Sequence, residues 1–214
     1  MKIYRIEVNV EKYQWIMADI SEDDNDFIDI HFFNGEEKNN WRKDVDFYVY
    51  NPKNLKGNFF YLDGGSALVF DQAVYDSPIF DLFEQSGQII SINCSGERLY
   101  ILNVLECINM LDLKKSKFEI YDDGSKGDVL DFYFHEDRIS ESSIFKIPQM
   151  NASQVFTYSD VKDASDEFIY LYNKFNFTGL EFEKLYETPV LSSLSLVVII
   201  FKSYFRNRVA FFMA

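Results

Sequence analysis

Short segments in which apolar and polar residues alternate recur along this chain, and clusters of turn-forming residues separate them. Residues 1–10 (MKIYRIEVNV) alternate in this way, as do residues 27–33 (FIDIHFF), where Ile28, Ile30 and Phe32 share one face. A period of two residues is typical of a β-strand with one buried face. The same reasoning predicts further strands at residues 44–51, 57–65, 88–93, 97–104, 116–121, 128–137, 144–150, 154–159 and 179–186.

Two segments have helical periodicity instead. In residues 71–86 (DQAVYDSPIFDLFEQS), Pro78 predicts a division into two pieces and Gly87 supplies the stop. A second helix is predicted at residues 164–176. Because the strands outnumber the helices and do not alternate with them as in βαβ units, the sequence predicts an α+β fold, with a mainly antiparallel sheet and two or three helices. We expect a single domain over residues 1–188.

The charge balance restricts the partners of such a domain. The 214 residues include 35 acidic and 21 basic residues, for a formal net charge of −14 at pH 7. This field repels nucleic acid and anionic membranes, and it accelerates encounter with a basic protein. We therefore expect no nucleic-acid partner and favour a basic protein partner, although acidity can also serve solubility alone.

Cysteine and histidine are too few for a disulfide framework or a structural zinc site. The chain has two cysteines, Cys94 and Cys107, and two histidines, His31 and His135. We expect no metal and no cofactor. The first ten residues show no apolar segment of the kind that a secretory signal needs. Reduced thiols in a cytoplasm fit this pattern best.

Residues 189–214 differ in composition from the rest of the chain. They contain Lys202, Arg206 and Arg208 and no acidic residue. Their apolar stretch PVLSSLSLVVIIF is 13 residues long, shorter than the roughly 20 that a membrane-spanning helix needs. Three interpretations stay open for this atypical tail: a buried final strand, a membrane anchor, or a tail from a shifted reading frame. A membrane partner is not favoured.

The position of Cys107 bears on whether the chain is an enzyme. If residues 101–111 are helical, Cys107 lies within an apolar stripe, three residues after Val104 and four before Leu111. A thiol there is buried among aliphatic side chains, which raises its pKa and makes it inert. The charged residues beside it are acidic and would not stabilise a thiolate. We therefore predict that Cys107 packs in the core and is not a nucleophile.

His135 is the other candidate for acid–base chemistry. Alternation over residues 129–135 places Leu130, Phe132 and Phe134 on one face and His135 on the other, beside carboxylates. No G-x-S-x-G, H-E-x-x-H or glycine-rich phosphate loop occurs in the sequence. We predict that the chain has no catalytic residues. The alternative is an uncharacterised hydrolase or transferase that uses His135 with nearby carboxylates.

Two loops concentrate negative charge, one at residues 19–27 and one at the turn of the hairpin predicted over residues 116–137. Each is a solvated turn in the simplest interpretation. Closely spaced carboxylates on loops can also meet Lys and Arg of a partner and raise the association rate. The abundant tyrosines offer a second kind of binding surface, or half-exposed positions on strands. The acidic residues that we identify as candidates for partner binding are Glu22, Asp23, Asp24, Asp26, Asp122 and Asp123.

Several blocks of the sequence resemble a family of bacterial immunity proteins. The most telling are LNVLECINMLD (102–112), IFKIP (144–148) and TGLEFE (178–183), and the resemblance spans residues 40–186. The family belongs to polymorphic or secreted toxin systems, and was formerly a domain of unknown function typified by a myxobacterial protein. The resemblance implies an α+β protein that binds and neutralises a cognate toxin in the cytoplasm, with no established catalytic residues. The sequence departs from the family pattern at Pro189, because members usually end soon after the GLEFE-like strand.

Two functions from different classes follow. The resemblance implies an antitoxin that occludes a cognate toxin, which the net charge predicts to be basic, and the acidic candidates above then become toxin-binding residues. Under this hypothesis, Asp23→Lys together with Asp24→Lys slows association at low salt. Under the enzyme hypothesis, His135→Ala removes an activity. The sequence makes no prediction about the oligomeric state.

Overall fold

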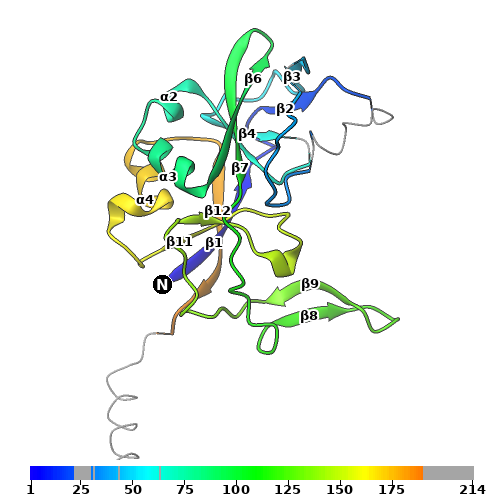
Figure 1. Ribbon diagram of the computed structural model, residues 1–214, viewed down its shortest axis with the longest axis vertical. Coiled ribbons are helices and arrows are strands. Elements are labelled where there is room, and N and C mark those ends of the chain that lie inside the picture. The colour runs from blue at the N-terminus through cyan, green and yellow to red at the C-terminus, as the bar shows by residue number, and fades with distance from the viewer. Residues whose placement is uncertain (22–29, 31, 43, 63, 190–214) are drawn as a thin grey trace, which may run out of the picture.

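The structure is a computed structural model that describes residues 1–21, 30, 32–42, 44–62 and 64–189. In this part of the chain a closed six-stranded barrel lies beside a four-stranded sheet (Figure 1). Among the described residues, three short α-helices pack against strands of both units, and a two-stranded hairpin extends away from the rest of the fold. The predominance of strands and of antiparallel pairing was predicted, whereas the closure of six strands into a barrel was not.

The strands are β1 (Lys2–Val8), β2 (Trp15–Ala18), β3 (Phe47–Val49), β4 (Phe59–Leu62), β5 (Leu68–Phe70), β6 (Gly87–Cys94), β7 (Glu97–Val104), β8 (Lys117–Ile120), β9 (Lys126–Asp131), β10 (Ile144–Phe145), β11 (Phe156–Ser159) and β12 (Leu180–Glu187). The α-helices are α2 (Gln72–Tyr75), α3 (Ile79–Ser86) and α4 (Phe168–Lys174). Two 3-10 helices span Pro148–Met150 and Ala164–Asp166.

The barrel has the strand order β2–β3–β6–β7–β5–β4, and β4 closes on β2. Its longest pair is the β6–β7 hairpin, which is in register from Gly87 and Val104 at one end to Cys94 and Glu97 at the other. Two of the pairings are parallel, β2 with β4 and β3 with β6. The barrel therefore depends on contacts between segments that no hairpin connects, which local sequence patterns do not encode.

The second sheet has the strand order β10–β11–β1–β12, and all of its pairings are antiparallel. Ile3 of the central strand β1 pairs with Tyr158 of β11 and Tyr186 of β12. Ile3, Phe145 and Phe156 are fully buried and belong to the same apolar cluster. Strands that are distant in the sequence thus share one core.

A cluster of aromatic rings joins the barrel to the helices. Phe59 of β4 is fully buried, and its ring centroid lies 6.3 Å from that of Phe83 in α3. The rings of Phe168 and Tyr172 in α4 lie 6.0 and 5.8 Å from Phe59. Edge-to-face and tilted contacts at these distances are favourable beyond the burial of area alone. Phenylalanine side chains therefore fill much of this core.

The helical prediction for residues 71–86 is confirmed, including its division into two pieces. The carboxylate of Asp71 accepts a hydrogen bond from the Val74 N–H at 3.0 Å and caps α2. Pro78 immediately precedes α3, where its missing N–H costs no intrahelical bond. α3 ends at Gly87, as predicted, and β6 begins there.

Other segments depart from the predictions. Residues 101–111 are not a helix, because β7 continues to Val104 and irregular backbone follows it. The strand predicted over residues 144–150 is only two residues long, because Pro148 has no N–H and begins a 3-10 helix. In the predicted strand at residues 27–33, most of which lies outside the described residues, Ile30 is buried but Phe32 is 52% exposed. These two residues therefore do not share a buried face.

Several predictions concern residues that the structure does not describe. The acidic candidates Glu22, Asp23, Asp24 and Asp26 lie there, as does the atypical tail from residue 190 onward. Across the described ranges, none of the helices has the length and apolar character needed to span a membrane.

Candidate protein-binding arm

Residues 117–131 form a hairpin, hereafter the arm, that extends away from the rest of the fold (Figure 1). Within the described residues β8 and β9 pair only with each other. Asp122 and Asp123 lie exposed at its turn, as predicted. Asp123 Oδ1 accepts hydrogen bonds from Oγ (2.6 Å) and N (2.9 Å) of Ser125, and these bonds hold the pKa of Asp123 below its usual range. Asp123 therefore shapes the turn while keeping its negative charge.

The pairing of the arm contains a bulge next to its base. Lys117 pairs with Asp131 and Phe118 pairs with Val129, which leaves Leu130 without a partner on β8. An extra residue of this kind bends the strand and redirects side chains. Leu130 is 68% exposed as a result of its place in the bulge.

The same bulge explains why one sequence prediction was wrong. Strict alternation over residues 129–135 placed Leu130 and Phe134 on a common face. Phe134 is only 6% exposed and packs in the core, whereas Leu130 faces solvent. Because one unpaired residue shifts the period by one position, alternation on one side of the bulge says nothing about the other side.

Contacts between side chains order the arm although it has no core of its own. Lys126 Nζ lies 4.4 Å from the ring centroid of Phe118, a cation–π contact. The ring of Tyr121 lies over Gly127, where an added Cβ would approach Tyr121 Cζ to 2.7 Å. Gly127 thus gives the ring a flat surface to cover, close to the tip of the arm.

Two chain segments are joined where the arm begins. The Asp112 N–H donates to the Tyr133 carbonyl at 2.8 Å, and the Tyr133 N–H donates to Ser116 Oγ at 3.0 Å. Leu111 forms an isolated antiparallel bridge with Phe134, and both side chains are buried. The base of the arm is therefore fixed by the core, although its outer part is exposed.

Asp112 also stabilises the turn that leads into β8. Its Oδ1 accepts hydrogen bonds from the N–H groups of Lys114 (3.0 Å) and Lys115 (3.2 Å). Desolvation raises the pKa of Asp112, but these bonds and the Lys115 ammonium outweigh it and hold the pKa below its usual range. Asp112 lies in the LNVLECINMLD block, and its place in the structure gives that block a role in positioning the arm.

The surface of the arm combines apolar side chains with carboxylates. Leu130 (68% exposed) and Ile120 (60% exposed) are the most exposed large apolar residues that the structure describes, and Tyr121 is 50% exposed. The arm holds two lysines and five acidic residues. Both lysines already have partners, since Lys117 Nζ lies 3.0 Å from Asp131 and Lys126 covers Phe118. The acidic residues are Glu119, Asp122, Asp123, Asp128 and Asp131.

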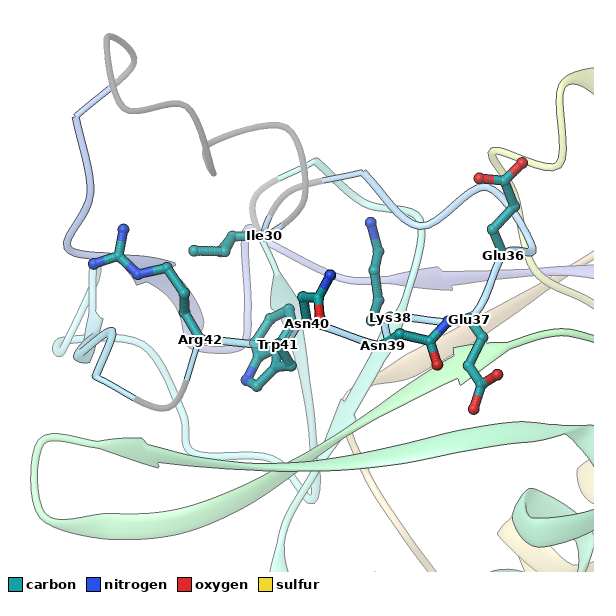
Figure 2. Close-up of a pocket in the computed structure, with 8 residues that line it drawn as sticks. All are labelled: Ile30, Glu36, Glu37, Lys38, Asn39, Asn40, Trp41 and Arg42. Atoms are coloured by element: carbon teal, nitrogen blue, oxygen red, sulfur yellow. The ribbon is translucent and has the colours of Figure 1, made fainter.

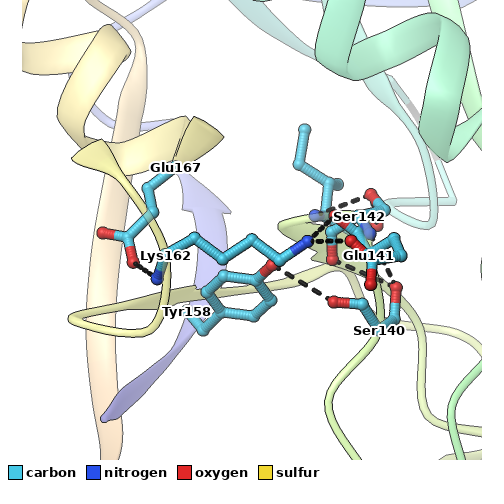
Figure 3. A network of polar contacts seen from close by, with 7 residues as sticks. Ser140, Glu141, Ser142, Tyr158, Lys162 and Glu167 are labelled. Atoms are coloured by element: carbon cyan, nitrogen blue, oxygen red, sulfur yellow. Dashed lines mark hydrogen bonds and ion pairs between the residues drawn. The ribbon is translucent and has the colours of Figure 1, made fainter. Parts of the chain in front are cut away.

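A polar network holds the segment that returns from the arm to β10 (Figure 3). Lys162 Nζ donates to the Glu141 carbonyl at 2.7 Å and pairs with its carboxylate. The Tyr158 hydroxyl donates to the Ser140 carbonyl at 3.3 Å, and burial raises the pKa of this phenol, which therefore stays neutral. Glu167 in turn accepts a hydrogen bond from the Lys162 N–H at 3.0 Å. The segment that follows the arm is thereby tied to the body of the protein.

Cys107 does not pack in the core, so that prediction was wrong. The residue is exposed, because the chain has left β7 and forms only an isolated bridge with Lys146. Its Sγ lies against Gly35, where an added Cβ would approach it to 2.5 Å. Although the residue is exposed, partial desolvation of its sulfur raises the pKa of the thiol, and nearby Lys146 opposes this to a smaller extent. The predicted direction of the pKa shift thus agrees, although the predicted location does not.

His135 lies at the base of the arm, where its backbone N–H donates to the Met110 carbonyl at 2.7 Å. Among the described residues, no hydrogen bond joins its imidazole to Cys107 or to a carboxylate. The two sequence candidates for chemistry are therefore not brought together as a nucleophile and a base.

Lys146 is buried, which its sequence pattern does not predict. Its side chain is fully inaccessible to solvent, and its Nζ donates to the carbonyls of Ser66 (2.7 Å) and Phe33. Burial lowers the pKa of Lys146 to about 8. No carboxylate pairs with it within the described ranges. The IFKIP block therefore contains a lysine that joins distant segments inside the fold.

A cavity of about 210 Å³ lies at the loop before β3 and is lined by Ile30 and residues 36–42 (Figure 2). The Trp41 ring stacks on Phe47, with centroids 6.4 Å apart. The carboxylates of residues 36 and 37 lie at one end of the cavity and the Arg42 guanidinium at the other, so charged groups do not converge on one point (Figure 2). In the part of the chain that the structure covers, no three potential ligands gather into a metal site.

The arm and both segments at its base lie inside the region that matches a known family. Residues 89–187 match the model of an immunity protein family (Imm11). The resemblance to an immunity protein family is therefore confirmed over this part of the chain, whereas residues 40–88 of the predicted span lie outside the match. No curated protein sequence matches the chain.

Proposed function

We propose that this chain is an immunity protein that binds a cognate bacterial toxin and neutralises it by occlusion. The observation that carries the proposal is the match of residues 89–187 to an immunity protein family. An immunity protein has to meet the toxin inside the cell that produces it. The proposed location is therefore the cytoplasm.

The net negative charge of the chain indicates what kind of toxin it would bind. The net charge of −14 attracts a basic partner and accelerates its encounter with the chain. Acidic inhibitors facing basic nucleases follow the same logic, as the barnase–barstar pair illustrates. Occlusion requires a surface that fits the toxin and no covalent step. The proposed partner is therefore a toxin with a positively charged surface around its active site.

Co-expression tests this proposal directly. The full chain is expressed together with the toxin encoded beside its gene, and growth is compared with that of cells that express the toxin alone. The purified proteins are then mixed, and binding is measured by calorimetry. We expect rescue of growth and a stable complex with this toxin, and neither result with an unrelated toxin. Failure of the wild-type chain both to protect and to bind would remove the proposal.

A further inference from the structure

We propose that the arm is the element that enters the toxin, with Ile120 and Leu130 seated in an apolar cleft that has a basic rim. The inference rests on the proposed function, and it adds the contact surface and the chemistry of the partner.

Exposure is the first reason. Ile120 is 60% and Leu130 68% exposed, and Tyr121 beside them is 50% exposed. Three large apolar side chains are therefore exposed on one short hairpin, and exposed apolar area gathered on one element is typical of a binding surface. The aromatic ring of Tyr121, held over Gly127, matches the residue type that is enriched at the centres of interfaces.

The construction of the arm is the second reason. The bulge leaves Leu130 unpaired and turned outward, although strict alternation would have placed it with the buried Phe134. At the base, Asp112 and Ser116 hold both strands through hydrogen bonds to the backbone of Tyr133. An arm fixed in this way presents its apolar residues without a large ordering cost upon binding.

Charge identifies the occupant. The arm has five carboxylates but only two lysines, and both lysines already contact other residues of the arm. A partner with Lys and Arg around an apolar cleft satisfies both kinds of surface. A second copy of this chain would bring carboxylates against carboxylates, and a phosphate backbone would be repelled as well. The toxin is therefore the occupant that the arm fits.

The first test removes apolar surface without changing charge. Ile120→Ser together with Leu130→Ser is expected to weaken toxin binding by about tenfold or more, because exposed side chains at the centre of an interface dominate affinity. Leu55→Ser is the matched control, since Leu55 is 59% exposed on the loop between β3 and β4. We expect this control to bind within about twofold of the wild type. Equal binding by the arm variant and the wild type overturns the inference.

The second test shortens the arm. Phe118 and Val129 are directly paired, so Glu119–Asp128 can be replaced by Asn-Gly, which closes a two-residue hairpin turn. The shortened chain should keep the thermal stability of the wild type and should lose both protection and binding. Full protection by a folded, shortened chain overturns the inference even where the proposed function holds.

The third test concerns the rim. Asp122→Lys together with Asp128→Lys should slow association with the toxin at low salt, and the difference should shrink as salt is added. Asp163→Lys together with Asp166→Lys makes the same change of net charge at exposed positions before α4. Equal slowing by both pairs shows that only net charge matters and overturns the basic rim.

The outcomes separate the two proposals. If the wild-type chain neither binds nor protects, the proposed function fails. If the wild type binds and the arm variants bind equally well, the inference alone fails. If the arm variants change the oligomeric state of the chain and leave toxin binding intact, the arm joins copies of this chain, and the inference is again wrong.

Discussion

The ammonium of Lys146 donates a hydrogen bond to the main-chain carbonyl of Phe33, although 113 positions separate the two residues. The same Nζ donates to the Ser66 carbonyl at 2.7 Å, and Ser66 Oγ accepts a hydrogen bond from the Phe33 N–H at 2.9 Å. Three distant segments therefore meet at one buried lysine. Burial of its charge lowers the pKa of Lys146 to about 8.

This pKa predicts how stability depends on pH. Between pH 8 and 10.5 the folded state holds fewer protons at Lys146 than the unfolded state, so this group makes the free energy of unfolding rise with pH. The full rise is ~3 kcal/mol, and a neutral amine can still donate to both carbonyls. Urea unfolding of the wild type and of Lys146→Met across this range measures the difference. A difference that stays constant or falls with pH contradicts the assignment.

The local elements of the fold were predictable because their signals are local. The β6–β7 hairpin surrounds a turn that its own residues specify, and Asp71, Pro78 and Gly87 mark the ends of two helices. In the same way, the arm and its exposed Asp122 and Asp123 follow from alternation on both sides of a turn. Caps and turns act over three or four residues, so one sequence is enough to read them.

The closure of the barrel and the role of Lys146 were not predictable in this way. Parallel pairing of β2 with β4 joins Trp15 to Tyr61, and no nearby residue encodes it. A lysine between Phe145 and Ile147 has the sequence pattern of an exposed position, yet its ammonium lies in the core. At the candidate site, the bulge at Leu130 interrupted the period on which the prediction depended. Each failure concerns a long-range contact or an irregularity of the backbone.

Gly179 predicts a large loss of stability on substitution. It adopts a φ of +112°, and an added Cβ would overlap the Phe59 carbonyl oxygen. We expect Gly179→Ala to lower the free energy of unfolding by ~3 kcal/mol or more, from backbone strain and steric overlap together. Gly96 has a φ of +87° with nothing within 4 Å of its added Cβ, so Gly96→Ala measures the strain alone, ~1 kcal/mol. Equal losses in chemical denaturation would show that the overlap is relieved.

Gly35 and Cys107 predict a coupled pair of substitutions. Gly35 has a φ of +86°, and its added Cβ would lie 2.5 Å from Cys107 Sγ. Gly35→Ala should therefore cost more in the wild type than in a Cys107→Ala background, by ~1 kcal/mol or more. A double-mutant cycle with urea unfolding measures the coupling. Additive losses would mean that the thiol moves aside without cost.

Asp112 predicts a link between the base of the arm and its binding surface. Asp112→Ala removes the acceptor of the hydrogen bonds from Lys114 and Lys115. We expect a loss of ~1–2 kcal/mol in stability and faster amide exchange in residues 117–131, because the turn before β8 loosens. Asp122→Ala at the exposed tip is the control and should leave exchange at the base unchanged. Unchanged exchange in the arm of the Asp112 variant would show that the turn holds without the carboxylate.

The last prediction separates binding from catalysis. His135 and Cys107 are joined by no hydrogen bond in the described structure, and the Cys107 thiol has a raised pKa, so it is a poor nucleophile at neutral pH. His135→Ala and Cys107→Ser should therefore leave toxin protection and affinity within about twofold of the wild type, as substitutions outside an interface do. Growth rescue and calorimetry with purified protein measure both quantities. Loss of protection in a His135→Ala chain that still folds and binds the toxin would instead indicate a chemical step, because removal of a catalytic base abolishes turnover while binding persists.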